Sequence, residues 1–351
     1  KQASLCYKKL NMSKKNSSVI LKNNFKGFKD LTEIYNSFKK KINPFKKKNF
    51  LVAVSGGPDS LALAALTKSL NYEKNLKFFY VLIDHNIRAN SSKEAILVKK
   101  LLDKNDIKLK IIKNKKEITK NVQSQARTVR YNLLTDFCKE KKISIILTAH
   151  NLEDQVETFF IRLSRGSGLY GLSSMKQISE ISKKIHLVRP LLDVKKEKLI
   201  KISKTVFGKY FKDPTNVNSK YLRTRIRSLK KSLEKSGINY DRIFQSIKNL
   251  ATSRDTLDLY FKAIYKRIIL KKRNKIFIKF NDLNILNQEM KMRVFEKLIK
   301  DFTNSYYMPR TKKVINLVNT LESKKRAKLT LGGCIIYRDN NQIILEKEIK
   351  I

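Results

Sequence analysis

The sequence contains no tryptophan, three cysteines, five prolines and only 30 acidic residues among its 351. The cysteines, Cys6, Cys138 and Cys334, lie far apart and form no CxxC pair, which argues against both a disulfide framework and a zinc site. This cysteine usage is typical of a reducing cytoplasm. No stretch approaches the roughly 18 consecutive apolar residues of a membrane span, so the sequence predicts a soluble cytoplasmic protein with no membrane partner.

Positive charge is what the sequence has in excess. Lys and Arg number 78 against 30 Asp and Glu, which gives a formal net charge of +48. An extended polyanion such as a nucleic acid is the natural partner of that charge. Lysine nevertheless outnumbers arginine by 61 to 17. An AT-rich genome would produce the same bias, so the charge alone does not establish nucleic-acid binding.

The first segment of the chain differs from the rest. Residues 1–29 are basic and lack the apolar core of a secretion signal. Met12 has the context of a true start, so residues 1–11 carry no fold prediction. We expect residues 1–44 to form a basic, partly disordered extension.

From Phe50 onward, apolar runs alternate with helix-compatible segments. The predicted strands cover 50–54, 77–83, 107–112 and 143–147, and the predicted helices cover 60–70, 93–102, 124–139 and 152–163. Strands separated by helices are parallel and are joined by right-handed crossovers. The pattern therefore predicts a doubly wound, mostly parallel α/β domain over residues 45–220. Its ligand site should lie at the carboxyl ends of the strands, which carry Ser55, Asp84 and His150.

The strand pattern stops after Asn216. Residues 221–270 are helix-compatible and rich in Lys and Arg, which predicts a helical linker. Residues 271–351 predict a small α+β domain, with strands at 275–280, 334–337 and 342–345. Asp339 and Asn340 lie between the last two strands and predict a hairpin turn.

The most specific motif is the segment Ser55–Ser60, which reads Ser-Gly-Gly-Pro-Asp-Ser directly after the first strand. Gly56 and Gly57 permit a turn tight enough for successive backbone N–H groups to point at one anion, and the following helix adds its positive N-terminal end. Pro58 suits the first turn of that helix. Asp59 fits an anion site only if a cation accompanies the anion, so it is the candidate Mg²⁺ ligand. The alternative is an ordinary strand-to-helix turn capped by a serine.

A second group of polar residues follows the strand that ends at 147. His150, Asp154 and Glu157 are spaced by four and three residues, which places them on one face of the predicted helix. Three interpretations are open: a divalent metal site, a capped and solvated first helical turn, or a substrate site. The neighbouring motifs favour the third.

Taken together, these motifs resemble a known family. Ser-Gly-Gly-x-Asp-Ser after a first strand is similar to the PP-loop of the ATP pyrophosphatases, which cleave ATP between its α and β phosphates to adenylate a substrate. No lysine stands where a Walker A loop needs one. Within that superfamily the chain resembles the tRNA(Ile)-lysidine synthetases over residues 40–349, although Thr224 stands where many members carry Asn. The matching segments are Asp84–Arg88, Gln125–Tyr131, His150–Thr158, Arg165–Gly168, Arg189–Leu192, Asp213–Asn216, Arg223–Arg227 and Leu331–Leu345.

The resemblance implies a reaction and its cofactors. Members of the family convert the cytidine at the first anticodon position of an isoleucine tRNA, whose anticodon is CAU, to lysidine. They consume ATP and free lysine and release AMP and pyrophosphate. On this chain the resemblance implies that ATP lies against Asp84 and the phosphate turn, with Mg²⁺ on Asp59. The turn residues are Ser55, Gly56, Gly57, Pro58, Asp59 and Ser60.

The resemblance also implies roles for the remaining polar residues. Arg127 or Arg130 would offset charge on the transferred phosphoryl group. Asp154 and Glu157 would hold the lysine, with His150 or one of those carboxylates as the base. The C-terminal domain and the linker would bind tRNA. The expected tRNA contacts are Arg130, Arg223, Arg225 and Arg227.

Two other functions remain open at this point. A tRNA thiolase with a PP-loop would explain the phosphate turn, but such relatives rely on active-site or cluster-bound cysteines, and Cys138 is expected to be buried in a helix. An RNA-binding protein without catalytic activity would explain the charge but not the phosphate turn. The oligomeric state is open as well, with a homodimer as one option.

Overall fold

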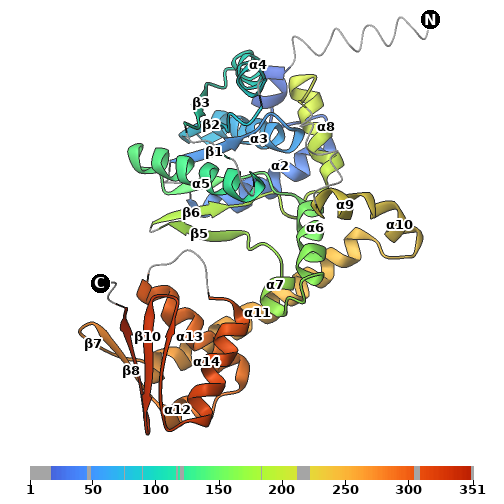
Figure 1. Ribbon diagram of the computed structural model, residues 1–351. Helices are drawn as coiled ribbons and strands as arrows, with labels where there is room; N and C mark the ends of the chain where they lie inside the picture. The colour runs from blue at the N-terminus through green and yellow to red at the C-terminus, as the bar shows by residue number, and fades with distance from the viewer. Residues whose placement is uncertain are drawn as a thin grey trace, which may run out of the picture. The chain divides into compact units, whose positions relative to one another are not determined.

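The computed structural model describes residues 17–45, 49–74, 76–88, 90–115, 118, 122–182, 184–211, 222–303 and 309–348. The chain divides into two compact units, Lys1–Ala251 and Thr252–Ile351 (Figure 1). Each unit has its own sheet and its own hydrophobic core. The motif Asp213–Asn216 lies outside the described residues. Among the described helices, none is long and apolar enough to cross a membrane.

The first unit is built on a six-stranded sheet with the spatial order β3-β2-β1-β4-β6-β5. All neighbouring strands are parallel except β5, which is antiparallel to β6. This topology confirms the predicted doubly wound, mostly parallel α/β fold. The strands are β1 (Phe50–Val54), β2 (Phe78–Asp84), β3 (Leu109–Lys113), β4 (Ile145–Leu147), β5 (Ile178–Ser182) and β6 (Ile185–Val188).

Helices cover both faces of this sheet. Because successive strand residues point to opposite faces, Val52 contributes to one core and Leu51 to the other. The core around Leu51 includes Leu134 and Cys138 of α5 (Val122–Glu140), and the thiol of Cys138 is buried as expected. The core around Val52 is covered by α2 (Lys29–Ile42), α3 (Pro58–Lys74), α4 (Ser91–Asp103) and α8 (Lys196–Phe207).

The described part of the N-terminal segment packs into the first unit. Leu31, Phe38 and Ile42 of α2 are fully or almost fully buried in the core beneath α3. The Tyr35 hydroxyl donates a hydrogen bond to Glu73 on α3 (2.6 Å). The boundary expected at residue 44 therefore cuts through a packed core. The apolar residues of α2 do recur at helical spacing, but the basic composition of residues 1–44 favoured the expectation of an extension outside the fold.

The remaining helices of the first unit are α6 (Leu152–Leu163), α7 (Leu169–Leu172), α9 (Leu222–Ser228) and α10 (Lys230–Lys235). Helix α11 (Tyr240–Ile268) begins in the first unit and ends in the second. The start of α11 packs on α6 through Tyr240 and Ile243, whereas Phe261 and Ile264 belong to the core of the second unit. The expected helical linker over 221–270 is thus helical but is not a separate body, because its two ends are buried in different cores.

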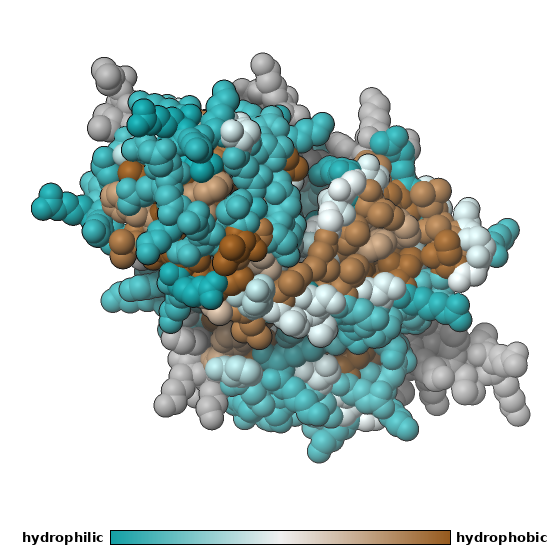
Figure 2. All heavy atoms as spheres, turned by 90° about the horizontal axis from the view of Figure 1, so that it is seen from below, coloured by the Kyte–Doolittle hydropathy of each residue, from teal (hydrophilic) through white to brown (hydrophobic). Residues whose placement is uncertain are grey.

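The second unit is an antiparallel sheet covered on one face by helices. Its strands have the spatial order β7-β8-β11-β10-β9, and the expected hairpin joins β10 to β11, with Asp339 opposite Gln342 and Asn340 at φ +49°. The elements are β7 (Leu270–Lys272), β8 (Lys275–Lys279), α12 (Phe280–Asn284), α13 (Gln288–Thr303), α14 (Thr311–Ser323), β9 (Arg326–Leu331), β10 (Cys334–Asp339) and β11 (Gln342–Lys347). Seen from below, hydrophilic residues dominate the surface, beside one apolar area (Figure 2).

Candidate functional site

The phosphate turn follows β1 and leads directly into α3. Gly56 adopts φ +81°, and a Cβ added there would lie 2.5 Å from Cγ2 of Val98 on α4. Both the backbone conformation and the space therefore require glycine. Pro58 is the first residue of α3, where its missing N–H costs nothing. The open N-terminal amides of α3 thus face the end of the turn, as an anion site requires.

Hydrogen bonds hold the turn in this shape. The Ser60 hydroxyl donates to Gly57 O (3.0 Å) and accepts from Ser55 N (3.1 Å). Phe211 N donates to Gly56 O (3.0 Å), so the segment after α8 closes the turn from the other side. The site is preorganised, because the backbone that would face a phosphate is fixed by other parts of the protein.

Asp59, in the first turn of α3, has an unusual environment. Its Oδ1 is buried and has no hydrogen-bond partner, and burial raises the pKa of the carboxyl group to about 6. Lys196 at the start of α8 opposes that rise in pKa, whereas Asp154 adds to it. A buried, unpartnered carboxylate oxygen beside an anion turn fits a divalent cation. Among the described residues, no group of three His, Cys, Asp or Glu side chains could hold a metal ion.

Asp154 belongs to the cap of α6. Asn151 is the N-cap residue: its side chain accepts from Asp154 N (3.0 Å), and Asp154 Oδ2 accepts from Asn151 N (3.2 Å). The interpretation of a capped first turn therefore describes Asp154 correctly. The same carboxylate also lies close enough to Asp59 to raise its pKa, so the cap and the phosphate turn form one acidic site.

Glu157 lies one turn further along α6 and is almost completely buried, with 2% of its side chain exposed. Its Oε1 accepts from Arg227 Nε (2.7 Å) and its Oε2 accepts from Arg227 Nη2 (3.0 Å). Arg223 Nε lies 3.5 Å from Oε2. Burial raises the pKa of Glu157, and the hydrogen bonds from Arg227 oppose that rise. The two arginines of α9 thus compensate a buried carboxylate.

His150 lies between β4 and α6, with Nδ1 3.0 Å from the Thr148 hydroxyl. Burial lowers the pKa of its imidazole to about 4; Asp154 raises it, and Arg189, Arg127 and Arg223 lower it further. The imidazole is therefore neutral at physiological pH.

Asp84, at the end of β2, holds the following turn together. Its Oδ2 accepts from the Ser92 hydroxyl (2.6 Å) and its Oδ1 from Asn86 N (2.9 Å). Burial acts to raise the pKa of Asp84, but these hydrogen bonds outweigh it and the pKa is lowered. Asp84 therefore caps this turn. The order β2-β1-β4 nevertheless brings Asp84, Ser55 and His150 to neighbouring strand ends, as predicted.

The two arginines of α5 have different surroundings. Arg130 donates through Nε and Nη2 to Nε2 of His85 (3.3 and 3.2 Å). Burial, followed by the charge of Arg130, lowers the pKa of His85 to about 4, so its ring stays neutral and accepts these hydrogen bonds. Arg127 is exposed, its guanidinium lies 4.9 Å from the centre of the Tyr131 ring, and its charge reaches His150.

The structure separates the three arginines that were expected to contact tRNA together. Arg225 is exposed on α9. Arg227 and Arg223 face Glu157, although 33% and 42% of their side chains stay exposed. Their contact with tRNA stays a prediction. The spacing Arg-x-Arg-x-Arg does not show which arginines pair with a carboxylate, because Glu157 is 70 residues away from Arg227 in the sequence.

Sequence reasoning assigned no role to several residues that border the site. Asn151 caps α6, and Glu153 Oε2 accepts from Lys196 N (2.9 Å), which caps α8. Arg189 Nη1 donates to Lys176 O (2.7 Å). The side-chain amide of Gln155 bonds the backbone of Met175 twice: its Oε1 accepts from Met175 N (2.8 Å) and its Nε2 donates to Met175 O (3.0 Å). The motifs around His150 and Arg189 contained these residues, but their partners come from other elements.

Comparisons with known proteins agree with this geometry. A family model described as a PP-loop domain matches residues 31–233. A tRNA(Ile)-lysidine synthase from Wolbachia pipientis wMel is 32% identical over 87% of this chain and 72% of that protein. One from Rickettsia typhi is 29% identical over 90% of this chain and 74% of that protein. Among solved structures, the U34-tRNA thiolase NcsA of Methanococcus maripaludis has a similar fold, with a TM-score of 0.52 and 22% identity, covering 63% of this chain and 78% of that one.

Proposed function

We infer the reaction of this site from one premise: the chain belongs to the tRNA(Ile)-lysidine synthase family of PP-loop enzymes. It is an ATP-using, tRNA-modifying ligase. We propose that it joins the ε-amine of free lysine to C2 of cytidine 34 in the CAU anticodon of tRNA(Ile). One observation carries the assignment to this chain: the phosphate turn, the unpartnered oxygen of Asp59 and the acidic first turn of α6 meet in one place.

The first half of the reaction activates the base. The C2 oxygen of cytosine is a poor leaving group, and transfer of AMP to that oxygen makes it a good one. In this proposal the turn at Gly56 and Gly57 and the hydroxyl of Ser60 hold the departing pyrophosphate. Arg127 and Arg130 offset charge on the transferred phosphoryl group, as such transfers require.

Asp59 would hold Mg²⁺ when ATP binds. The cation would supply positive charge that neutralises the phosphates of ATP. Its arrival would also lower the pKa of Asp59 from about 6, since a cation favours the ionised carboxyl group. Lys196, whose charge already acts on Asp59, would add a second positive charge at the same phosphates.

The second half of the reaction begins with the neutral fraction of the lysine ε-amine, whose ordinary pKa is about 10.4, so one proton is lost to solvent before attack. The C2–N bond then forms as the bond from C2 to the adenylated oxygen breaks, and AMP leaves with that oxygen. We assign the binding of the lysine ammonium group to the carboxylates of Asp154 and Glu157. We assign proton acceptance to His150, because Asp154 is used by the helix cap and Glu157 by the arginine pair. Once the lysine nitrogen is bonded to the electron-poor C2, its remaining proton is more acidic than that of a free ammonium group. A neutral imidazole with a pKa of about 4 can accept such a proton.

Mass spectrometry of the modified nucleoside tests this function. An isoleucine tRNA transcript with a CAU anticodon, ATP and isotopically labelled lysine should yield labelled lysidine with equimolar AMP. Incorporation of labelled sulfur instead would indicate a thiolase, a function that the two described cysteines disfavour, because Cys138 and Cys334 are buried in different units. Binding of tRNA without ATP–pyrophosphate exchange would indicate an RNA-binding protein without catalytic activity.

A further inference from the structure

Among the described elements of the second unit, the helices pack on one face of the sheet and none covers its outer face. Apolar side chains on its inner face, such as Ile336 and Ile343, are fully buried against α13 and α14. Burial alternates along each strand, so every second residue points to the outer face. The residues at these outer positions include Lys328 on β9, Tyr337 on β10 and Phe277 on β8.

Tyr337 stands in a cross-strand row that spans this outer face. It is directly opposite Lys328 on β9 and Ile344 on β11, and Ile344 is opposite Phe277 on β8. Side chains opposite one another on the same face have Cβ atoms about 4.5–5.5 Å apart. The row therefore forms a continuous strip: a lysine, an aromatic ring, an aliphatic side chain and a second aromatic ring.

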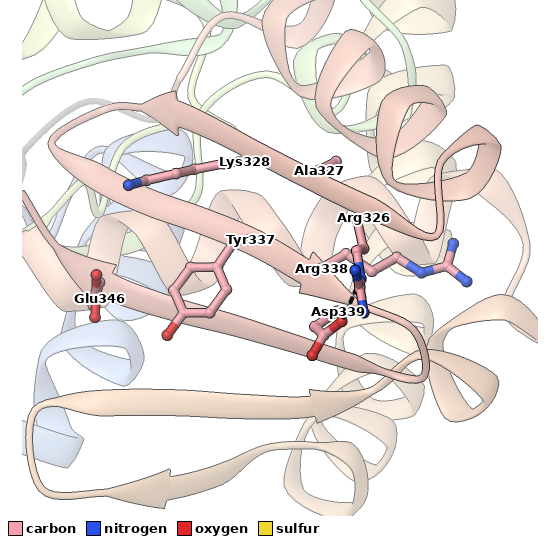
Figure 3. A pocket seen from close by; sticks show the side chains of 7 residues that line it. All are labelled: Arg326, Ala327, Lys328, Tyr337, Arg338, Asp339 and Glu346. Atoms are coloured by element: carbon pink, nitrogen blue, oxygen red, sulfur yellow. Dashed lines mark hydrogen bonds and ion pairs between the residues drawn. The ribbon is translucent and has the colours of Figure 1, made fainter.

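The surface around Tyr337 is hollowed. A cavity of about 650 Å³ lies here, and its lining includes Arg326, Lys328, Tyr337, Asp339 and Glu346. Figure 3 shows the Tyr337 ring with Lys328 on one side and Glu346 on the other, each from a neighbouring strand. A planar group laid on the ring would thus be flanked by charged side chains.

The charges on this face favour an anion. Both acids beside the strip are already paired: Asp339 with Arg326 (3.2 Å) and Glu346 with Lys275 (2.8 Å). Lys328 adds positive charge to a face whose acids are compensated. In residues 252–351 as a whole, 23 Lys and Arg stand against 10 Asp and Glu. A polyanion that also carries flat apolar groups matches both properties.

We propose that the outer face of this sheet binds an unpaired stretch of RNA, with Tyr337 as the platform on which one base stacks and Lys328 against a neighbouring phosphate. Open antiparallel sheets with exposed aromatic rings read unpaired bases in this way, because base stacking buries both flat surfaces while the phosphates remain at the basic rim. The inference rests on the proposed function, which supplies a tRNA. The stacked base is distinct from the cytidine that reacts in the first unit.

The absence of tryptophan from the chain allows a direct test. Tyr337→Trp places the single indole of the protein on the strip, and stacking of a base should quench its fluorescence. We expect quenching by the tRNA transcript and by single-stranded oligoadenylate, and none by a blunt RNA duplex. The matched control is Tyr72→Trp, at a tyrosine of α3 that is 38% exposed and lies outside the linker and the C-terminal domain, whose fluorescence should not change.

Affinity gives a second measurement. Tyr337→Ala should weaken tRNA binding by roughly 5- to 100-fold, and Tyr337→Phe should leave it nearly unchanged, since the ring supplies the stacking. Circular dichroism melts check that each variant folds. The inference is overturned if tRNA leaves the fluorescence of Tyr337→Trp unchanged while lysidine is still formed, or if the duplex quenches equally. If the fluorescence of Tyr337→Trp falls with rising protein concentration in the absence of RNA, the face binds a second copy of the chain, and this result would also overturn the inference. Failure of the proposed function is separate: it would appear as absent lysidine in the unaltered protein.

Discussion

Both carboxylate oxygens of Glu157 are held by one side chain, the guanidinium of Arg227, at 2.7 and 3.0 Å. The pair joins α6, whose first turn borders the phosphate turn, to α9. A buried carboxylate left without this partner would be strongly unfavourable, so each residue depends on the other. Any lysine that reaches Glu157 must share it with Arg227 or displace it.

Glu157→Gln should therefore affect stability and lysine binding together. Because Arg227 is one-third exposed, we expect the free energy of unfolding to fall by up to about 3 kcal/mol, the lower end for breaking a buried pair. The Michaelis constant for lysine should rise more than that for ATP. Urea unfolding and steady-state kinetics measure the two effects. Arg225→Gln is the matched control on the exposed face of α9, and a larger defect for ATP than for lysine would contradict the assignment.

Asp154→Asn tests the shared cap in a different way. An asparagine keeps an oxygen that can accept from Asn151 N, so the fold should persist with a loss of about 1 kcal/mol or less. The lost charge should lower the pKa of Asp59 and raise the Michaelis constant for lysine. An unchanged Michaelis constant for lysine would show that Asp154 only caps α6 and does not bind lysine.

Asp59→Asn should abolish ATP–pyrophosphate exchange and leave tRNA binding nearly intact, because the carboxylate for the cation is lost while the basic surface is not. The variant should also change the dependence of stability on pH. The pKa of Asp59 is raised from 3.8 to about 6 in the folded protein. The folded state therefore binds more protons between these values, and Asp59 lowers stability as pH rises from about 4 to 6.

Between pH 4 and pH 7 the melting temperature should consequently fall less steeply with rising pH for Asp59→Asn than for the unaltered protein. Mg²⁺ with ATP should stabilise the unaltered protein at pH 7 and have little effect on the variant. Exchange activity of the variant that matches the unaltered protein across a Mg²⁺ titration would refute the metal assignment.

His85→Ala should lower the turnover number and leave the Michaelis constant for tRNA unchanged. The neutral imidazole accepts from two nitrogens of Arg130 and fixes the direction of its guanidinium. His85→Gln, which keeps an acceptor, should recover part of the turnover. The unaltered activity should also decline on acidification toward the His85 pKa of about 4, since a protonated ring cannot accept. Equal turnover for the Ala and Gln variants would remove this role from His85.

Gly56→Ala should eliminate ATP binding. The added Cβ would meet Val98 Cγ2 at 2.5 Å, and alanine disfavours φ +81°. Combining it with Val98→Ala should restore part of the folding stability by removing the clash, while the strained backbone keeps ATP affinity low. Isothermal titration with ATP and a urea melt separate these contributions. Unimpaired ATP affinity in Gly56→Ala alone would exclude the turn from the nucleotide site.

Local sequence patterns were sufficient to predict the class of fold and the place of the phosphate turn. Strand and helix periods are local, so the first four strands, their order of helices and the motif Ser55–Ser60 could be predicted from neighbouring residues. The sequence analysis predicted no helix at α2, although its apolar residues have helical spacing, because the surrounding segment is so basic. It also predicted no strand at β5, β6, β7 or β9, which are short and whose pairing depends on distant strands.

Which charged side chains pair with one another depends on how the helices pack, and the sequence does not show it. Arg223, Arg225 and Arg227 are equivalent in the sequence, and the crossing of α9 over α6 turns two of them inward to Glu157 and leaves one exposed. The same holds for Asp59, whose raised pKa comes from burial beneath residues far along the chain. Spacing identifies residue types that can do chemistry, but pairing and desolvation depend on packing between elements, and these set the charge that each residue carries.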